Sequence, residues 1–383
     1  MATENNNKTL NVPNLRFPEF HKPYSSTTIS KLATIVGGGT PDTTVPDYWN
    51  GGIQWFTPSE IGKNKYTNKS ERTISQEGLN NSSAKLLPIN TILLSTRATI
   101  GESSIAKAEC CTNQGFQSLI ANEEIVCYEY LYYLVATLKK ELIRKSCGST
   151  FLEISANEVR KIKTFVPSLE EQGKVSSLLS LIDERIATQI KIIEKLESLI
   201  KGLCSSLFDK NKYDSFVRLG DISEITNGNS DVQDASLSYS DGMYPFFDRS
   251  EDIKFLPEYL LDKEAIIYPG EGSEFYPRYY NGKFALHQRC YAIYDIAPNF
   301  ATRYLYFFCK TQNSYFVRNA VGSTVASLRL DTFKRLNIPN IPIELQKTYV
   351  QLLDKIETKI VDNKIVLKKY EEQKRYLLSN LFI

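Results

Sequence analysis

The chain has 383 residues, of which 42% are apolar, and its 46 Lys and Arg against 44 Asp and Glu give a formal net charge of +2. This length predicts two to three domains with hydrophobic cores, which excludes a disordered chain. The balanced charge argues against a polycationic nucleic-acid coat, because it supplies almost no excess positive field. Any binding of nucleic acid must therefore come from how the residues are organised.

The N-terminal segment, residues 1–14, is polar and rich in Asn, and it lacks the apolar core of a signal peptide. No apolar run approaches the roughly 18 residues that a membrane span needs. None of the seven cysteines forms a Cys-x-x-Cys pair, so we expect free, mostly buried thiols. With only His21 and His287, neither a His-based metal site nor a His-dependent triad is expected. We expect a soluble, cytoplasmic protein with no metal and no cofactor.

The two halves of the chain repeat each other at a spacing of about 174 residues. Residues 147–150 return as 321–324, and both segments contain Gly-Ser-Thr. Each is followed by a short amphipathic stretch, then a Pro and a Gln, and then a long helical pattern that ends in Leu-Phe. The starts of the halves also match, at a different offset: Ile29, Leu32, Ile35 and Gly38 with Leu219, Ile222, Ile225 and Gly228. The pattern predicts a tandem duplication whose globular parts have diverged in length.

Both globular parts have the sequence pattern of mixed α/β domains. Strand-like runs between turn signals occupy residues 92–95, 117–120, 265–268 and 290–294. Helical stretches precede each Gly-Ser-Thr segment, at residues 129–145 and 302–320. We therefore expect the order globular unit, long helix, globular unit, long helix.

The two long helices carry the strongest periodic signal in the sequence. The first should begin at Ser168, with Glu171 completing a capping box. Steps of three and four residues define the apolar stripes, which predict a coiled coil with a 3.5-residue period. The stripes are Leu179, Ile182, Ile186, Gln189, Ile193, Leu196, Ile200 and Leu203 in the first helix, and Leu353, Ile356, Ile360, Asn363, Leu367, Tyr370 and Leu377 in the second.

A polar residue interrupts each stripe at the same repeat position, Gln189 in the first helix and Asn363 in the second. Such residues fix register at a cost in stability, and we assign them that role as a hypothesis. The alternative is that each helix packs only on its own globular unit. Antiparallel pairing predicts a pseudo-twofold molecule, in which helices of about 60 Å separate two similar units. Such a molecule suits a bipartite target whose spacing the helices fix.

The expected fold class is α/β, with two globular domains separated by two long helices that pair as an antiparallel coiled coil. The first domain spans residues 1–166 and the first helix 167–210. The second domain spans residues 211–341 and the second helix 342–383.

Enzyme motifs are missing from the sequence. It contains neither the Asn/Asp-Pro-Pro-aromatic tetrapeptide nor the Phe-x-Gly-x-Gly motif of amino-methyltransferases. It also has no phosphate-binding P-loop. Gly270 and Gly272 follow a strand, but Phe275 stands where a third glycine would complete a dinucleotide fingerprint. The acid-x-Lys motif of nucleases does not follow Pro41-Asp42. A methyltransferase or nuclease whose motifs are not recognised stays open as one hypothesis about function.

The sequence resembles the specificity (S) subunit of type I restriction-modification systems over nearly its whole length. Residues 12–20 are similar to the N-terminal segment of that family, and Gly37-Gly38-Gly39-Thr40-Pro41 to the glycine turn of its target-recognition domains. Further similar segments are 54–61, 97–101, 113–116, 269–272 and 281–284. Each motif alone is weak, but their order is repeated, and a coiled-coil helix follows each time. Asn227-Gly228-Asn229-Ser230 departs from the first glycine turn, so we expect the domains to read different sequences.

The resemblance implies two target-recognition domains, each reading one half of a split sequence in double-stranded DNA. It implies that the helices set the gap and hold modification (methyltransferase) subunits, which restriction (translocase-nuclease) subunits join. It implies no catalysis by the chain itself. The alternative is a duplicated coiled-coil adaptor whose units bind proteins and not DNA.

Candidate DNA contacts are loop residues whose side chains can read bases or hold phosphates. Arg reads guanine, Gln and Asn read adenine, and Ser, Thr and backbone amides bind phosphates. The Gly-Ser-Thr segments stand ahead of short helices, whose N-termini can bind phosphate. The candidates are Thr40, Thr96, Arg97, Asn113, Gln114, Ser149, Thr150, Arg278, Gln288, Arg289, Ser323 and Thr324.

Each candidate also has a purely structural reading. The first-domain residues can belong to solvated loops, and the arginines near residue 278 can snorkel from a half-buried strand. The Gly-Ser-Thr segments can simply cap local backbone. Residues 1–165 hold 18 Lys and Arg against 15 Asp and Glu, and residues 214–340 hold 13 against 16. Phosphate neutralisation supplies most non-specific affinity, so we expect the isolated chain to bind DNA weakly.

Overall fold

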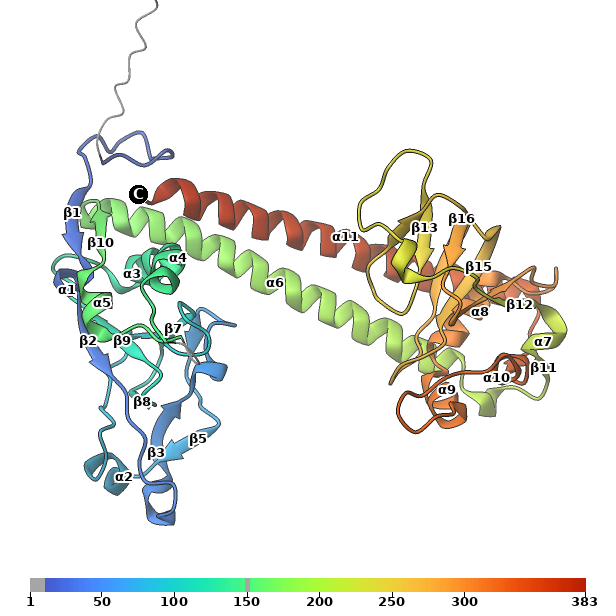
Figure 1. Ribbon diagram of the computed structural model, residues 1–383, viewed down its shortest axis with the longest axis horizontal. Coiled ribbons are helices and arrows are strands. Elements are labelled where there is room, and N and C mark those ends of the chain that lie inside the picture. The colour runs from blue at the N-terminus through green and yellow to red at the C-terminus, as the bar shows by residue number, and fades with distance from the viewer. Residues whose placement is uncertain (1–10, 149–151) are drawn as a thin grey trace, which may run out of the picture. The chain divides into compact units, whose positions relative to one another are not determined.

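The computed structural model describes residues 11–148 and 152–383, which form two compact units (Figure 1). The first unit contains the residues up to 189 together with 366–383, and the second contains residues 190–365. The first domain therefore lies in the first unit and the second domain in the second unit. Both long helices, α6 (Leu169–Leu207) and α11 (Ile343–Leu381), contribute residues to both units.

The first domain is built on a five-stranded sheet with the order β2-β9-β6-β7-β4, beside a three-stranded sheet with the order β5-β3-β8. A third pair, β1-β10, joins the start of the domain to its end. The elements are β1 Ser25–Thr28, α1 Ile29–Leu32, β2 Ala33–Gly37, η1 Pro46–Tyr48, β3 Trp49–Phe56, η2 Pro58–Glu60, β4 Tyr66–Thr67, β5 Arg72–Ile74, α2 Gln76–Asn80, β6 Ile92–Leu94, β7 Ser103–Ala106, β8 Cys110–Thr112, β9 Gln117–Ala121, α3 Tyr128–Thr137, α4 Lys139–Arg144, α5 Ala156–Lys161 and β10 Lys163–Val166.

The second domain repeats this plan with a single six-stranded sheet of order β12-β17-β15-β16-β13-β14 and a terminal pair, β11-β18. Its elements are η3 Lys210–Lys212, β11 Phe216–Arg218, α7 Leu219–Ile222, β12 Glu224–Asn227, η4 Val232–Asp234, β13 Tyr244–Phe247, β14 Lys254–Leu256, β15 Leu261–Pro269, β16 Arg278–Leu286, β17 Cys290–Tyr294, α8 Thr302–Lys310, α9 Asn313–Asn319, α10 Leu330–Lys334 and β18 Asn337–Pro339. The strands β12, β17 and β15 correspond to β2, β9 and β6 of the first domain.

The cores explain why these segments fold. All three residues of β6 are buried, and α3 lays its apolar face, including Tyr130 and Leu134, on the sheet. Burying such side chains contributes roughly 1.5–3 kcal/mol each. In the second domain α8 buries nearly its whole length, and Tyr268 of β15 packs on Phe316 and Phe333.

The predicted strands and helices are found close to their expected bounds. The strand prediction at 290–294 matches β17, and the helical stretch at 129–145 is α3 and α4, which Leu138 separates. The long helices each have 39 residues, and their bounds differ by the 174 residues of the repeat. At the start of α6 the Ser168 Oγ accepts a hydrogen bond from the Glu171 N–H at 3.4 Å, which is one half of the expected capping box. The Glu171 carboxylate binds Arg16 and Tyr24.

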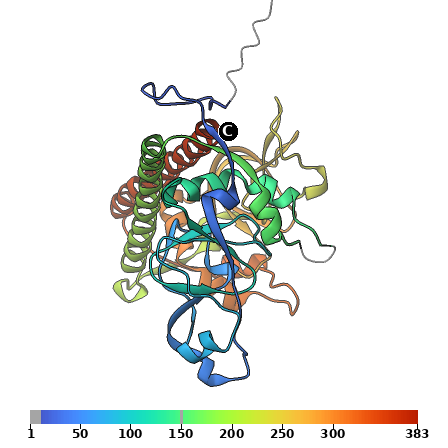
Figure 2. The same ribbon diagram turned by 90° about the vertical axis from the view of Figure 1, so that its left-hand side faces the viewer.

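Within each unit the long helices pair in opposite directions, which confirms helix-on-helix packing. The ribbons of α6 and α11 run side by side (Figures 1 and 2), and in the first unit Asp183 of α6 pairs with Lys374 of α11 at 2.6 Å. In the second unit Glu197 pairs with Lys364 at 2.6 Å. Every residue of the two predicted stripes is buried or half-buried.

The alternative, in which each helix packs on a globular unit, is partly true as well, because both helices also contact a globular domain. Leu179 and Ile182 of α6 join the core of the first domain. In the second unit Glu357 of α11 binds Arg303 and Lys310 of α8.

Among the described residues no helix has the length and apolarity to cross a bilayer. The cysteines are free, and five of them are buried. Burial raises the pKa of Cys110 to about 12 and that of Cys290 to about 11. Thiolates of these residues are therefore scarce at neutral pH.

Candidate nucleic-acid interface

A glycine turn follows β2 in the first domain and presses against the loop that leads into β9. A Cβ added to Gly38 would lie 2.0 Å from the Asn113 carbonyl oxygen, so only glycine fits. This close approach continues the antiparallel pairing of β2 with β9, in which Gly37 faces Gln117. It brings the predicted residues Thr40, Asn113 and Gln114 together at the end of the sheet.

The side chains at this place, which we call the first junction, hold each other. The Thr40 hydroxyl donates to Gln114 Oε1 at 2.5 Å. Asn113 Oδ1 accepts from the Gly115 N–H at 2.9 Å, which orders the loop. Arg97 lies next to the junction. A Cβ added to Gly115 would be 3.6 Å from the Cβ of Arg97. Its Nε and Nη2 donate to Glu153 Oε2 at 3.0 and 2.7 Å.

The second domain has an equivalent place, the second junction. A Cβ on Gly228 would lie 2.0 Å from the Leu286 carbonyl oxygen. This turn therefore presses against the end of β16, where the loop into β17 begins. Gln288 Nε2 donates to Asp231 Oδ2 at 3.2 Å. Arg289 Nη1 donates to both carboxylate oxygens of Glu271, at 2.8 and 2.9 Å.

Backbone hydrogen bonds show that the two junctions correspond. The N–H of Thr96 donates to the Gly115 carbonyl, and that of Gly270 donates to the Arg289 carbonyl. Two further bonds match in the same way, Ile154 N–H to Thr96 and Leu328 N–H to Gly270. The repeat spacing pairs Arg97 with Glu271 and Glu153 with Ser327. The structure thus brings Arg97, Asn113 and Gln114 together in one domain and Gln288 and Arg289 in the other.

Four of the predicted contact residues do not fit this arrangement. Thr96 is buried, and its hydroxyl donates to the Gly115 carbonyl at 3.2 Å, so it is not a surface contact. Arg278 is half-buried and binds the Ser250 carbonyl, as the structural alternative had it. Ser323 and Thr324 are exposed in a loop closed by pairing of Val321 with Ser327, so they do not stand at the N-terminus of α10, which begins at Leu330. Ser149 and Thr150 lie outside the described residues.

Sequence reasoning missed the acidic partners, Glu153, Asp231 and Glu271. Each binds a predicted residue that is 18 to 57 positions away in the chain. No local motif marks such a pair. The repeat does not mark them either, because it places Glu153 at the position of Ser327 and Glu271 at the position of Arg97.

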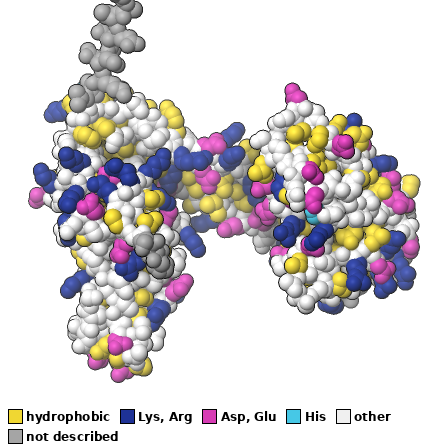
Figure 3. Space-filling view, in the orientation of Figure 1, with side chains coloured by type: hydrophobic (Ala, Val, Ile, Leu, Met, Phe, Trp, Pro, Cys, Tyr) yellow, Lys and Arg dark blue, Asp and Glu magenta, His cyan; other side chains and the backbone are white. Residues whose placement is uncertain are grey.

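The surface electrostatics agree with the composition. On the face drawn in Figure 3, Lys and Arg side chains are interspersed with Asp and Glu on each unit. The junctions follow the same rule, because the exposed arginines are paired with carboxylates. A site of this kind offers little long-range attraction for phosphate.

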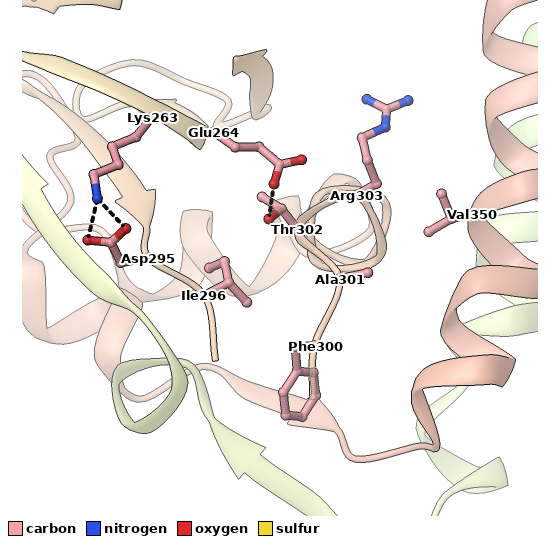
Figure 4. Close-up of a pocket in the computed structure, with 9 residues that line it drawn as sticks. All are labelled: Lys263, Glu264, Asp295, Ile296, Phe300, Ala301, Thr302, Arg303 and Val350. Atoms are coloured by element: carbon pink, nitrogen blue, oxygen red, sulfur yellow. Dashed lines mark hydrogen bonds and ion pairs between the residues drawn. The ribbon is translucent and has the colours of Figure 1, made fainter. Parts of the chain in front are cut away.

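The second domain also contains a pocket of about 460 Å³ between α8, β15 and Val350 of α11 (Figure 4). Its charged groups are paired: Lys263 binds Asp295, and the Glu264 carboxylate accepts from Thr302 at 2.7 Å and from Tyr279 at 2.5 Å. Burial, followed by the hydrogen bond to Glu264, raises the pKa of Tyr279. The pairing gives these groups a structural role. Among the described residues no group of three or more His, Cys, Asp and Glu could hold a metal.

Comparison with known proteins gives one consistent family. The sequence profile of the type I restriction modification DNA specificity domain matches residues 22–198 and again residues 212–369. The specificity subunit of the type I restriction enzyme MjaIX from Methanocaldococcus jannaschii is 29% identical over 391 residues and covers 90% of each chain. The EcoR124I/EcoR124II specificity subunit from Escherichia coli is 28% identical over 163 residues, which is 41% of this chain and 40% of that one.

The fold is shared with solved structures at lower sequence identity. The S subunit of a type I restriction-modification system from M. genitalium superimposes with a TM-score of 0.65 at 16% identity, over 97% of this chain and 99% of that one. A chain from a type I system solved for its complex assembly and conformational transition gives 0.58 at 16% identity, over 95% and 99%. The two family matches take in most of the sequence, and the chain therefore belongs to the type I restriction-modification DNA specificity family.

Proposed function

We propose that each domain reads one half of a split target in double-stranded DNA through its junction. The carrying observation is that the same backbone arrangement occurs twice and presents an exposed Gln and an exposed Arg each time. Gln pairs with adenine and Arg with guanine in the major groove. The loops that hold these residues differ in sequence, which suits two different half-sites.

The helices α6 and α11 act as the spacer in this proposal, and their surfaces dock the modification subunits. Those subunits carry out adenine methylation, and restriction subunits with translocase and nuclease activity join them. The chain itself supplies recognition without catalysis, in the cytoplasm. Its near-neutral domains bind DNA weakly alone, since few phosphates are neutralised, and the complex binds tightly. Tight, salt-insensitive binding by the purified chain alone would contradict this part of the proposal.

The test is to express the chain with its modification subunits and to profile methylated adenines across the host genome. We expect a split motif with a fixed gap, which disappears when the chain is deleted. Gln114→Ala should relax or abolish recognition in one half of the motif, and Gln288→Ala in the other half. Gln76→Ala, an exposed glutamine on α2, is the matched control and should leave the motif unchanged. Methylation that persists without the chain would sink the proposal.

A further inference from the structure

Each exposed reading side chain of the two junctions is held by a neighbouring side chain. Thr40 holds Gln114 and Asp231 holds Gln288. Glu153 holds Arg97 and Glu271 holds Arg289, each through two hydrogen bonds. On the basis of the proposed function, we infer that Glu153 and Glu271 are specificity-determining latches: they keep the arginines from binding phosphate and release them to guanine.

The two Arg–Glu pairs are accessible to DNA, and little free energy is needed to separate them. The side chains of Arg97 and Glu153 are 44% and 37% exposed, and those of Arg289 and Glu271 are 62% and 18% exposed. Ion pairs at such exposure contribute only about 0–1 kcal/mol. A ligand that offers Arg an equivalent pair of acceptors can therefore replace the carboxylate.

Guanine offers that pair, and a phosphate alone meets a penalty. The N7 and O6 atoms of guanine lie side by side at the base edge and accept two hydrogen bonds from one guanidinium. A phosphate group also accepts from Arg, but it must approach the carboxylate that the Arg leaves behind, and the like charges repel. The latch thus weakens contacts that any sequence can make more than the contact that only guanine makes.

The duplication supports a role for the pair itself. The repeat spacing places Arg97 of the first domain at the position of Glu271 in the second, whereas Glu153 corresponds to Ser327 and Arg289 to Gly115. Each junction nevertheless keeps one Arg–Glu pair. The two pairs are therefore built from different positions of the repeat, and the presence of one pair in each junction supports a role for the pair itself.

The second junction contains one more hydrogen-bonded carboxylate than the first. Glu271 pairs with Arg289 and Asp231 accepts from Gln288, whereas in the first junction Glu153 pairs with Arg97. Local charge is therefore balanced in the first junction and negative in the second. Removing a carboxylate should raise non-specific binding at either junction.

The experiment uses the complex of the full chain with its modification subunits, two conservative variants and two matched controls. The variants are Glu153→Gln and Glu271→Gln. Each control removes a carboxylate from another surface ion pair: Glu158→Gln in the first domain, where Glu158 is 36% exposed, and Asp295→Asn in the second, where Asp295 is 47% exposed. Binding of the complex to labelled DNA duplexes is measured by fluorescence anisotropy at a series of salt concentrations. One duplex carries the methylated motif and the other lacks it.

We expect each latch variant to bind the duplex without the motif roughly threefold to fivefold tighter, with a salt slope steeper by about one, because one Arg becomes free for phosphate. Discrimination between the two duplexes should fall by the same factor, and adenines outside the motif should become methylated. The controls should leave slope and discrimination unchanged.

An unchanged salt slope and unchanged discrimination in both latch variants would overturn the inference, as would a loss of thermal stability with no change in DNA binding. Arg97→Gln and Arg289→Gln separate this failure from failure of the proposed function. If they impair motif binding while the latch variants change nothing, the latch is wrong and the junctions still read DNA. If the Arg variants also leave the motif and binding unchanged, the arginines do not read DNA, and both the latch and the arginine contacts of the proposed function are wrong.

Discussion

Gln172 and Gln346 make the same three hydrogen bonds in two different domains. Gln172 Oε1 accepts from the Cys127 N–H, and its Nε2 donates to the carbonyls of Ile125 and Pro167, at 2.9–3.0 Å. Gln346 repeats this with Ala301, Asn299 and Ile341 at 2.9–3.0 Å. Both side chains are fully buried. Each glutamine thus joins the first turn of a long helix to the loop before α3 or α8, and fixes where the helix leaves its domain.

Replacing either glutamine by alanine should destabilise its own domain. Gln346→Ala leaves one N–H and two carbonyls without the amide that they share, and an unsatisfied buried group costs about 1–3 kcal/mol. We expect a loss of roughly 2–4 kcal/mol, measured by urea unfolding. Hydrogen exchange should localise the loss to the start of α11, and for Gln172→Ala to the start of α6. Gln351→Ala, at an exposed position of α11, is the control and should cost under about 0.5 kcal/mol.

The ion cluster around Glu357 should also be essential to the second domain. Glu357 accepts hydrogen bonds from Arg303 at 2.6 Å, Lys310 at 2.9 Å and Tyr306 at 3.0 Å. Glu357→Gln would leave the two cations without this counter-charge, and we expect a loss of roughly 2 kcal/mol in urea unfolding. Glu344→Gln removes an exposed pair with Lys347 and should cost far less. Equal effects of the two variants would contradict this prediction.

The same cluster predicts a dependence on pH. Burial alone would raise the pKa of Glu357, but Lys310 and Arg303 outweigh it, so the pKa lies below its ordinary value of 4.5. The stabilisation is therefore complete above that value and is lost as the pH falls through the folded-state pKa. The stability difference between the native chain and Glu357→Gln should shrink as unfolding is measured at lower pH through this range.

The polar residues of the helix stripes give a further prediction. Gln189 is buried and Asn363 is half-buried, at equivalent repeat positions. If they fix register at a cost in stability, Gln189→Leu combined with Asn363→Leu should raise the melting temperature and permit alternative association, detected by light scattering. A double variant that loses stability would refute the register hypothesis.

The long helices could be predicted because their apolar period is local and repeats over many turns. The strand β17 could be predicted because Cys290–Tyr294 is a short apolar run between turns. Thr96 was misplaced because a hydroxyl just after a strand looks exposed in sequence, whereas the register of the loop turns it toward Gly115. Glu153 and Glu271 could not be assigned, since their partners are set by how loops distant in the chain meet. The buried role of Glu357 was hidden for the same reason.

The spacer role of the helices is open to a direct length test. Residues 193–199 of α6 and 358–364 of α11 belong to the paired part of the helices in the second unit, where Glu197 pairs with Lys364. Deleting both heptads keeps the 3.5-residue stripe and the pairing on either side. It shortens each helix by about 10 Å, since an α-helix rises 1.5 Å per residue. If the helices set the gap, the methylated motif should contain a gap shorter by about three base pairs, at 3.4 Å per step.

Two further variants make this test decisive. Deleting only one of the two heptads should misalign the helices and lower stability, which shows that the pairing is required. Replacing both heptads by heptads of equal length that keep only the stripe residues Ile193, Leu196, Ile360 and Asn363 should leave the original gap unchanged, because length and not sequence is the proposed determinant. A double deletion that folds, methylates DNA and keeps the original gap would show that the helices do not set the spacing of the two half-sites.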